Sequence, residues 1–204
     1  MYILALVTLM AASAVMADVP AFCNGYDCPR FKVLREMPDY EVREYEESRW
    51  VGTDVSGASF RQAGRSGFWR LFRYISGNNV ANAKIPMTCP VLRTIFPKEV
   101  AGSEGKYTTL FFQPLNLQEI GGPAPSDPDV YLQVVPKVVM YVRSFGGYAS
   151  EDDYLNEADI LAASINNSSA YINDEYYAAG YDSPFKFWNR HNEILFKARD
   201  SQKD

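Results

Sequence analysis

The sequence contains few of the residue combinations on which enzymes rely. His191 is the only histidine among 204 residues, and no Ser-His-Asp triad, Cys-His pair or His/Cys zinc set can be identified around it. The carboxylates are scattered, and their densest groups, EVREYEE and SEDD, are better explained as the polar face of a strand and the start of a helix. A hydrolase acting on a small apolar ligand would have no acid/base pair, so we expect a protein that is not an enzyme.

A predicted helix over residues 59–75, SFRQAGRSGFWRLFRYI, is the one place where unlike functional features converge. At about 100° per residue, one stripe of the helix is formed by Arg61, Arg65, Phe68 and Phe72, with Trp69 and Arg73 on its flank. The helix thus combines a flat aromatic surface with cations at its upstream end and along one margin. Such a face would suit a planar apolar ligand that carries carboxylates. The alternative is ordinary packing against the core, with the arginines reaching out to water.

Two glycines interrupt the same helix. In a helix interior, Gly64 and Gly67 each cost about 1 kcal/mol relative to alanine. Their presence is unexpected unless something must approach the helix backbone closely.

The N-terminal segment is typical of a secretory signal peptide. Residues 1–17 carry no charged side chain and end in Val15-Met16-Ala17, a small-x-small pattern that suits signal peptidase. Because no Lys or Arg precedes the apolar run, an uncleaved membrane anchor is the alternative, although about 16 apolar residues are fewer than the roughly 20 that a membrane span needs. We expect a secreted chain of residues 18–204 that forms one domain and has no membrane contact after cleavage.

The charge and the polar motifs of the chain indicate which partners and modifications to expect. A formal net charge of −5 argues against a nucleic-acid partner, which would require a basic excess. Asn166 and Asn167 each begin an Asn-x-Ser motif in a polar run, so secretion would make both candidate glycosylation sites on an exposed loop.

The three cysteines are expected to have structural roles. In an oxidising compartment Cys23 and Cys28 would form a small disulfide loop that leaves Cys89 free, although a pairing of Cys89 with either of them stays open. Cysteine-proline dipeptides, which occur at Cys28 and Cys89, can ligate iron. We expect instead that Cys89 is a small buried residue and that His191 is an exposed polar one, so both are weak candidates for a metal ligand.

The chain contains an internal repeat at an offset of 90 residues. Residues 40–57 align with 130–147, and each segment is predicted to form a β-hairpin of two Val-, Tyr- and Trp-rich runs. A predicted helix follows each hairpin, at 59–75 and at 150–165, where Ser150 is the expected N-cap. Further strands are predicted over residues 84–92, 91–96, 108–113, 174–185 and 193–196.

The order ββαββ therefore occurs twice, over about residues 40–113 and 130–196. It predicts an α+β fold in which a mostly antiparallel, distorted β-barrel is flanked by two helices. In the alignment of the repeats, Cys89 lies over Ala179. Pro86 and Pro90 would mark where the strand at 84–92 begins and where it breaks.

Five blocks of sequence run in order through most of the mature chain: YEVREYEESRWVGTDV, KIPMTCPV, PAPSDPDV, VRSFGGYA and YYAAGYDSPFKFWNRHNEI. In this order, over about residues 28–197, the chain resembles the SOUL/haem-binding protein family. The resemblance implies a duplicated α+β barrel with two helices. It also implies non-enzymatic binding of haem or a related tetrapyrrole, without an obvious axial ligand from the protein.

The resemblance also implies where a tetrapyrrole would bind, because in a family member that binds haem without an obvious axial ligand the first helix and a loop near the C-terminus make the pocket. Alignment on RYISG places basic residues at Arg65 and Arg73 and apolar residues at Phe68 and Phe72. Alignment on YDSPFKFWNRHNE adds Lys186. The cations would pair with the propionates of haem through charge-assisted hydrogen bonds.

Two departures from the family pattern leave an alternative open. One branch of the family is proposed to use a histidine in the first hairpin, and the matching residue here is Glu44. The signal peptide is the second departure, because well-known relatives are intracellular. The alternative is a protein-interaction module that has lost haem binding and docks a protein partner.

Overall fold

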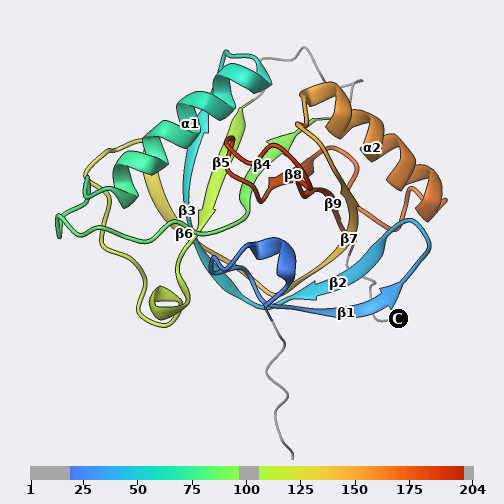
Figure 1. Ribbon diagram of the computed structural model, residues 1–204, viewed down its shortest axis with the longest axis horizontal. Coiled ribbons are helices and arrows are strands. Elements are labelled where there is room, and N and C mark those ends of the chain that lie inside the picture. Colours follow the sequence, from blue (N-terminus) through green and yellow to red (C-terminus); the bar gives the residue numbers. More distant parts are fainter. Residues whose placement is uncertain (1–18, 97–105, 200–204) are drawn as a thin grey trace, which may run out of the picture.

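The computed structural model describes residues 19–96 and 106–199 (Figure 1). The expected signal peptide at 1–17 lies outside the described residues. The elements in the described ranges are η1 (Ala21–Cys23), β1 (Phe31–Glu36), β2 (Glu41–Tyr45), β3 (Ser48–Val55), α1 (Phe60–Ile75), β4 (Val91–Ile95), β5 (Tyr107–Phe112), η2 (Leu115–Leu117), β6 (Val130–Val135), β7 (Val138–Phe145), α2 (Glu151–Ile165), β8 (Tyr176–Gly180) and β9 (Asn192–Lys197). After β1, the predicted order ββαββ occurs twice, which confirms the α+β fold class.

The strands form one antiparallel sheet in the order β1-β2-β7-β9-β8-β4-β5-β3-β6. Exchanging each strand of the first repeat for its counterpart in the second reverses the order from β2 to β6. The pseudo-twofold axis therefore passes between β4 and β8, which pair with each other. The sheet curls into a half barrel with α1 and α2 on its outer face (Figure 1).

The prediction of two local hairpins was wrong. Strand β2 pairs with β1 and β7, and β3 pairs with β5 and β6, so β2 and β3 are not neighbours although only Glu46 and Glu47 separate them. The first strand of each repeat instead pairs with the second strand of the other repeat. An alternating pattern identifies a strand but not its partner, which depends on contacts distant in the sequence.

The prediction of a strand over residues 84–92 was also wrong. Residues 84–90 are not in a strand, and β4 begins at Val91, directly after Pro90. The repeat offset is 90 through the helices, since β3 starts at Ser48 and β7 at Val138. It then falls to 85, because β4 starts at 91 and β8 at 176. Pro90 therefore marks the strand start that the sequence assigned to Pro86, and Ala179 pairs with Leu92 rather than matching Cys89.

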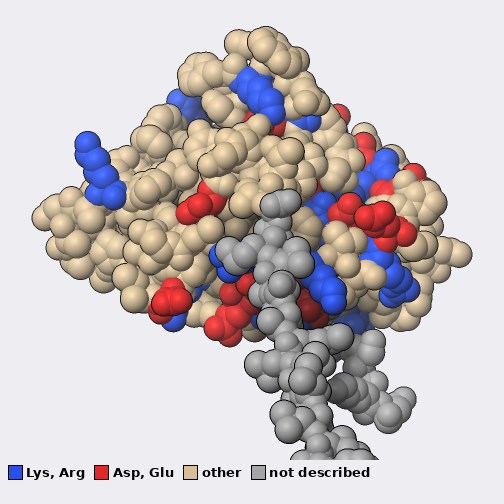
Figure 2. Space-filling model, turned by 60° about the horizontal axis from the view of Figure 1, so that its bottom comes forward, with Lys and Arg blue, Asp and Glu red and all other residues tan. Residues whose placement is uncertain are grey.

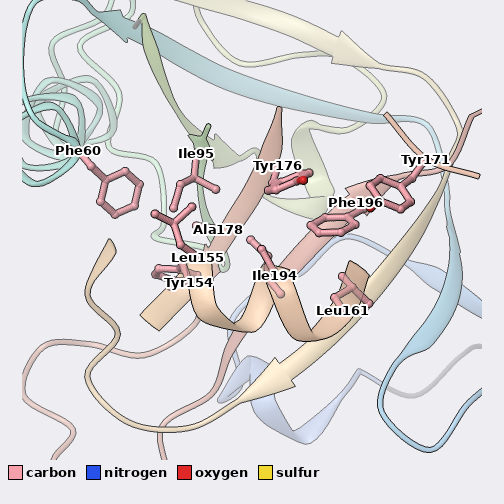
Figure 3. Close-up of a cluster of buried hydrophobic side chains, with 11 residues drawn as sticks. Phe60, Ile95, Tyr154, Leu155, Leu161, Tyr171, Tyr176, Ala178, Ile194 and Phe196 are labelled. Carbon is pink, nitrogen blue, oxygen red and sulfur yellow. The ribbon is translucent and has the colours of Figure 1, made fainter. Parts of the chain in front are cut away.

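Helix α2 begins and packs as its sequence predicts. The Ser150 hydroxyl accepts a hydrogen bond from the backbone N–H of Asp153, and the Asp153 carboxylate accepts one from Ser150 N, which completes a capping box. Tyr154 and Leu161 are buried against β7, β8 and β9 in the cluster that Figure 3 shows.

The outer surface of the molecule has two further features. In the face that Figure 2 shows, basic and acidic side chains are intermixed, in keeping with the small net charge. No helix in the described part of the chain is long and apolar enough to cross a membrane.

Candidate functional site

Helix α1 is fixed to the sheet by its N-terminal cap and by one face. The Ser59 hydroxyl accepts a hydrogen bond from Gln62 N, and the Gln62 side chain accepts one from Ser59 N. Leu71 and Tyr74 are buried, and they pack in one cluster with side chains of β3, β5 and β6. The opposite face of the helix is left to solvent.

The two glycines of α1 face the sheet. A Cβ atom at Gly67 would collide with the side chain of Thr109 on β5, and one at Gly64 would lie 2.7 Å from the end of the Arg93 side chain on β4. The close approach that the glycines indicated is therefore the approach of the sheet, and it gives no support for a ligand.

The outward face of α1 carries three aromatic side chains in mutual contact. The rings of Phe68 and Phe72 are stacked with their planes 15° apart and their centroids 5.8 Å apart. Trp69 packs edge-on against both rings. Phe68 rests on Phe111 of the core, whereas Trp69 and Phe72 are 51% and 37% exposed. The structure thus places Phe68 and Phe72 together, on an open aromatic surface.

The two predicted cations of α1 lie at either end of this surface. Arg65 is exposed and has no ion-pair partner among the described residues. Arg73 is also exposed, and its only ion pair in the described ranges is a long one of 4.0 Å to Asp127. Both guanidinium groups can therefore meet an added anion.

Lys186 belongs to the loop between β8 and β9. Its ammonium group donates to Asp182 Oδ1 at 2.6 Å and to Asn24 Oδ1 at 3.2 Å, and neither partner is on α1. The loop is pinned by Arg190, which donates to the carbonyl oxygens of Ser183 and Lys186. The Lys186 charge is thus already compensated within its own loop, unlike that of Arg65.

The same loop presents aromatic side chains that sequence reasoning did not assign to a site. Phe185, Phe187 and Trp188 are 82%, 70% and 76% exposed. The letters FKFW between Pro184 and Asn189 could have indicated them, because large apolar residues rarely cluster in an exposed turn. Tyr148 helps to hold the loop, since its hydroxyl donates to the carbonyls of Pro184 and Lys186.

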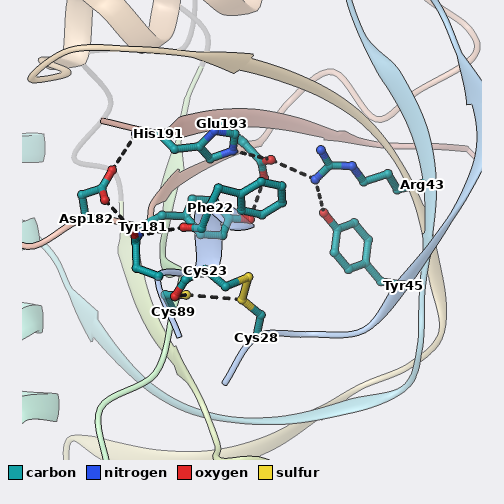
Figure 4. The surroundings of a disulfide bond; sticks show 11 residues. Phe22, Cys23, Cys28, Arg43, Tyr45, Cys89, Tyr181, Asp182, His191 and Glu193 are labelled. Carbon is teal, nitrogen blue, oxygen red and sulfur yellow. Dashed lines mark hydrogen bonds and ion pairs between the residues drawn. A yellow bond between two sulfur atoms is a disulfide. The ribbon is translucent and has the colours of Figure 1, made fainter. Parts of the chain in front are cut away.

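The cysteines lie inside the curled sheet (Figure 4). Cys23 and Cys28 form a disulfide and Cys89 is free and buried, which confirms the predicted pairing. The sulfur of Cys89 lies 3.3 Å from that of Cys28. Burial, together with the negative charges of Asp182, Glu193 and Asp27, raises the pKa of the Cys89 thiol to about 12. Cys89 therefore stays a neutral thiol near pH 7, which does not suit an iron-ligating thiolate.

His191 is not the exposed residue that the sequence predicted. It is half-buried, its ring stacks on Phe22 with centroids 4.2 Å apart, and its Nε2 lies 2.9 Å from Glu193 Oε1. The buried Glu193 carboxylate also accepts hydrogen bonds from Arg43 and from the Tyr181 hydroxyl. Sequence reasoning missed this role because Glu193 and Arg43 are 150 residues apart.

Two remaining predictions concern surface residues. Asn166, the C-cap of α2, and Asn167 are both exposed, so both sequons are sterically open to modification. Glu44 on β2 forms an ion pair of 2.8 Å with Lys137.

The sequence of the chain is similar to those of known proteins. The family model described as SOUL heme-binding protein matches residues 26–197. The chain is 35% identical to Heme-binding protein 1 of Xenopus tropicalis over 157 residues, which cover 77% of this chain and 82% of that protein. It is 36% identical to Heme-binding protein 2 of Homo sapiens, over 76% of each chain.

Among solved structures, the C-terminal domain of EcmrR has a similar fold. It aligns with a TM-score of 0.53 at 14% identity and covers 80% of this chain and 99% of that one. At this identity the likeness concerns the fold alone.

Proposed function

The chain belongs to the SOUL heme-binding protein family, and from that membership we propose that it binds haem or a related tetrapyrrole on the outward face of α1. The proposed role is binding without catalysis. The single observation that carries the location is the open aromatic surface of Phe68, Trp69 and Phe72.

This surface fits the chemistry of the group. Haem supplies a flat apolar macrocycle, an iron atom and two propionates. The rings of Phe68, Trp69 and Phe72 offer a continuous apolar area, and covering it would remove hydrocarbon from water. Phe68 is held from below by Phe111, so the surface needs little reorganisation before a ligand binds.

The arginines supply the charge that propionates require. Arg65 and Arg73 are eight residues apart, which corresponds to about 12 Å along the helix axis. Arg65 lacks an ion-pair partner among the described residues, and the single ion pair of Arg73 is long. Charge-assisted hydrogen bonds from these groups would orient a bound tetrapyrrole.

The loop between β8 and β9 would contribute its aromatic side chains more than its charge. Phe185, Phe187 and Trp188 supply exposed apolar area next to Lys186 in the chain. Because Asp182 already neutralises Lys186, reversal of the Lys186 charge should weaken binding less than reversal of the Arg65 charge.

Iron ligation from the protein forms no part of the proposal. The Cys89 thiol is buried inside the curled sheet, and the Nε2 atom of His191 is engaged with Glu193. Neither residue lies on α1, which favours a haem held by apolar and ionic contacts.

The proposed location of this function is extracellular. The uncharged segment at 1–17 and its Val15-Met16-Ala17 ending support secretion, and the disulfide between Cys23 and Cys28 suits an oxidising compartment. Mass spectrometry of the protein from its natural source should find Asp18 as the first residue.

Titration of the purified protein with hemin tests the proposal. A saturable change in the Soret absorbance at micromolar hemin is the expected result, with weaker binding in Arg65→Glu and Phe72→Ala. An absorbance that rises in proportion to hemin, without saturation, would contradict it.

Docking of a protein partner on the same surface is the second candidate function. It is favoured by Phe185, Phe187 and Trp188, because strongly exposed aromatic side chains that cluster on a surface are typical of a protein-docking site. Pull-down from extracellular fluid with and without hemin separates the two candidates, because a partner that competes for the surface is released by hemin.

A further inference from the structure

The two faces of the curled sheet are covered to different extents. On the outer face, beneath the helices, Val51, Phe111 and Ile194 are at most 1% exposed. On the inner face, Met140 and Tyr177 stay partly exposed although they are large and point toward the interior of the half barrel. Apolar side chains at such positions normally find a packing partner.

These inner side chains are partly exposed because they line a cavity of about 600 Å³. This volume lies within the range of about 300–1,000 Å³ that is usual for small-molecule sites. Its walls follow the internal repeat, since six lining residues form three pairs at the offsets of 90 and 85: Trp50 with Met140, Leu92 with Tyr177, and Leu110 with Leu195. The cavity therefore lies on the pseudo-twofold axis, where the two repeats meet.

The segment before the repeats completes one wall of the cavity. Phe22, Cys28 and Phe31 line it, and the disulfide between Cys23 and Cys28 holds this part of the chain inside the half barrel (Figure 4). The guanidinium of Arg43 lies over the Phe31 ring at 4.4 Å and supports it from outside the cavity. The wall is thus built by covalent and polar contacts that do not depend on a ligand.

The charged residues that line the cavity are Glu46, Lys137 and Lys197. Lys137 is neutralised by Glu44, whereas Lys197 is exposed and has no ion-pair partner among the described residues. Lys197 alternates along β9 with the outward-facing Phe196, so it lies on the same side of the strand as the lining residue Leu195. Glu46 is also exposed and without an ion-pair partner among the described residues, but it lies in the turn between β2 and β3, and β7 separates β2 from β9. An apolar space with an unpaired cation on the β9 side of its margin favours an apolar molecule whose single negative charge lies on that side.

We propose that this cavity is a second ligand site, which takes a free fatty acid of medium chain length. The hydrocarbon lies against Trp50, Leu110 and Met140, and the carboxylate meets Lys197. Removing the hydrocarbon from water drives the binding, and the ion pair with Lys197 fixes its direction.

The site is independent of the surface on α1. The residues of the cavity and those of the helix lie on opposite faces of the same sheet, so one ligand cannot contact both. A dianionic tetrapyrrole also matches the two arginines of α1 better than the single unpaired cation of the cavity.

Calorimetric titration of the full mature chain with decanoic acid tests the proposal, with 1-decanol as the uncharged analogue. We expect saturable binding of one decanoic acid per chain at micromolar concentration. Lys197→Gln should weaken decanoic acid by about five-fold and leave 1-decanol unchanged. Met140→Trp, which fills the cavity, should weaken both ligands at least ten-fold.

Two controls make the result decisive. Phe72→Ala on α1 should leave decanoic acid binding unchanged, and Met140→Trp should keep the unfolding midpoint in urea close to that of the unmodified protein. If Met140→Trp does not fold, Leu92→Phe replaces it as the filling variant. Absence of saturable decanoic acid binding, equal binding by the filled variant, or one-for-one displacement by hemin would each overturn the proposal.

Discussion

Arg43 on β2 and Glu193 on β9 form an ion pair inside the half barrel, with Nη1 and Oε1 2.9 Å apart and side chains that are 3% and 0% exposed (Figure 4). The strand β7 separates β2 from β9 in the sheet. The ion pair therefore joins β2 of the first repeat to β9 of the second across β7, which pairs with both strands.

Removal of one partner of this pair should destabilise the protein strongly. In Glu193→Leu the Arg43 charge stays buried and, within the described residues, keeps only Glu41 as a carboxylate partner, so we expect the free energy of unfolding to fall by about 3–5 kcal/mol. Urea denaturation measures the change. The double variant Arg43→Met/Glu193→Leu should lose less than the sum of the single variants, and strict additivity would contradict a direct interaction.

The stability of the fold should decrease in acid. Burial alone would raise the pKa of Glu193, but hydrogen bonds and charges from His191, Arg43 and Tyr181 lower it below its ordinary value of 4.5. At Asp182 burial alone would likewise raise the pKa. The hydrogen bond and the charge of Lys186 outweigh burial, so the pKa of Asp182 is lowered. A carboxyl group with a lowered pKa stabilises the folded state above its ordinary pKa, and this contribution is lost as the pH falls through the lowered value.

Thermal unfolding between pH 7 and pH 3 checks this expectation. The melting temperature should be nearly constant down to about pH 5 and then fall. Asp182→Asn should melt lower than the unmodified protein at pH 7 and approach it at pH 3. A constant difference between the two proteins across this range would show that the Asp182 charge does not matter.

The aromatic surface of α1 should determine the affinity for hemin. Phe72→Ala removes one of two stacked rings, and we expect affinity to fall about 5- to 30-fold, which corresponds to about 1–2 kcal/mol. Ile160→Ala on the exposed side of α2 removes a similarly exposed apolar side chain and is the matched control. Equal losses in both variants would indicate non-specific hemin adsorption.

The two glycines of α1 should respond differently to alanine. At Gly67 the added methyl group meets Thr109 beneath the helix, so Gly67→Ala should destabilise the protein by about 1–3 kcal/mol despite the better helix propensity. At Gly64 the neighbour is the end of the Arg93 side chain, which can move, so Gly64→Ala should change stability by less than about 1 kcal/mol. Chemical denaturation of both variants gives the comparison, and a stabilised Gly67→Ala would refute this packing.

The thiol of Cys89 should be unreactive in the folded protein. Its burial and its pKa of about 12 keep it protonated near pH 8. A thiol reagent should detect no reactive cysteine in the native protein, one in denaturant, and three in denaturant with a reductant. Peptide mapping that found Cys89 in a disulfide would contradict the assigned pairing.

Local patterns in the sequence predicted most elements and part of the site. Helix capping by Ser59 and Ser150 and the spacing of Phe68 and Phe72 depend on residues close in the sequence. The repeat offset of 90 is visible when the sequence is aligned with itself. One sequence is therefore enough to predict all of these features. The close cysteine pair was predictable for the same reason, because Cys23 and Cys28 are five residues apart.

The tertiary structure decided which distant segments meet. Strand β2 pairs with β7 of the other repeat rather than with its neighbour β3, and no alternating pattern carries that information. The same exchange brings Arg43 to Glu193, whose carboxylate also lies 2.9 Å from Nε2 of the half-buried His191. It also leaves the inner face of the sheet lined by both repeats around a cavity. The sequence alone thus determined the elements, the repeat and the aromatic stripe, whose causes are local. Strand partners, the buried ion pair and the cavity depend on contacts between residues far apart in the sequence, 150 positions in the case of the ion pair, and only the folded chain sets these contacts.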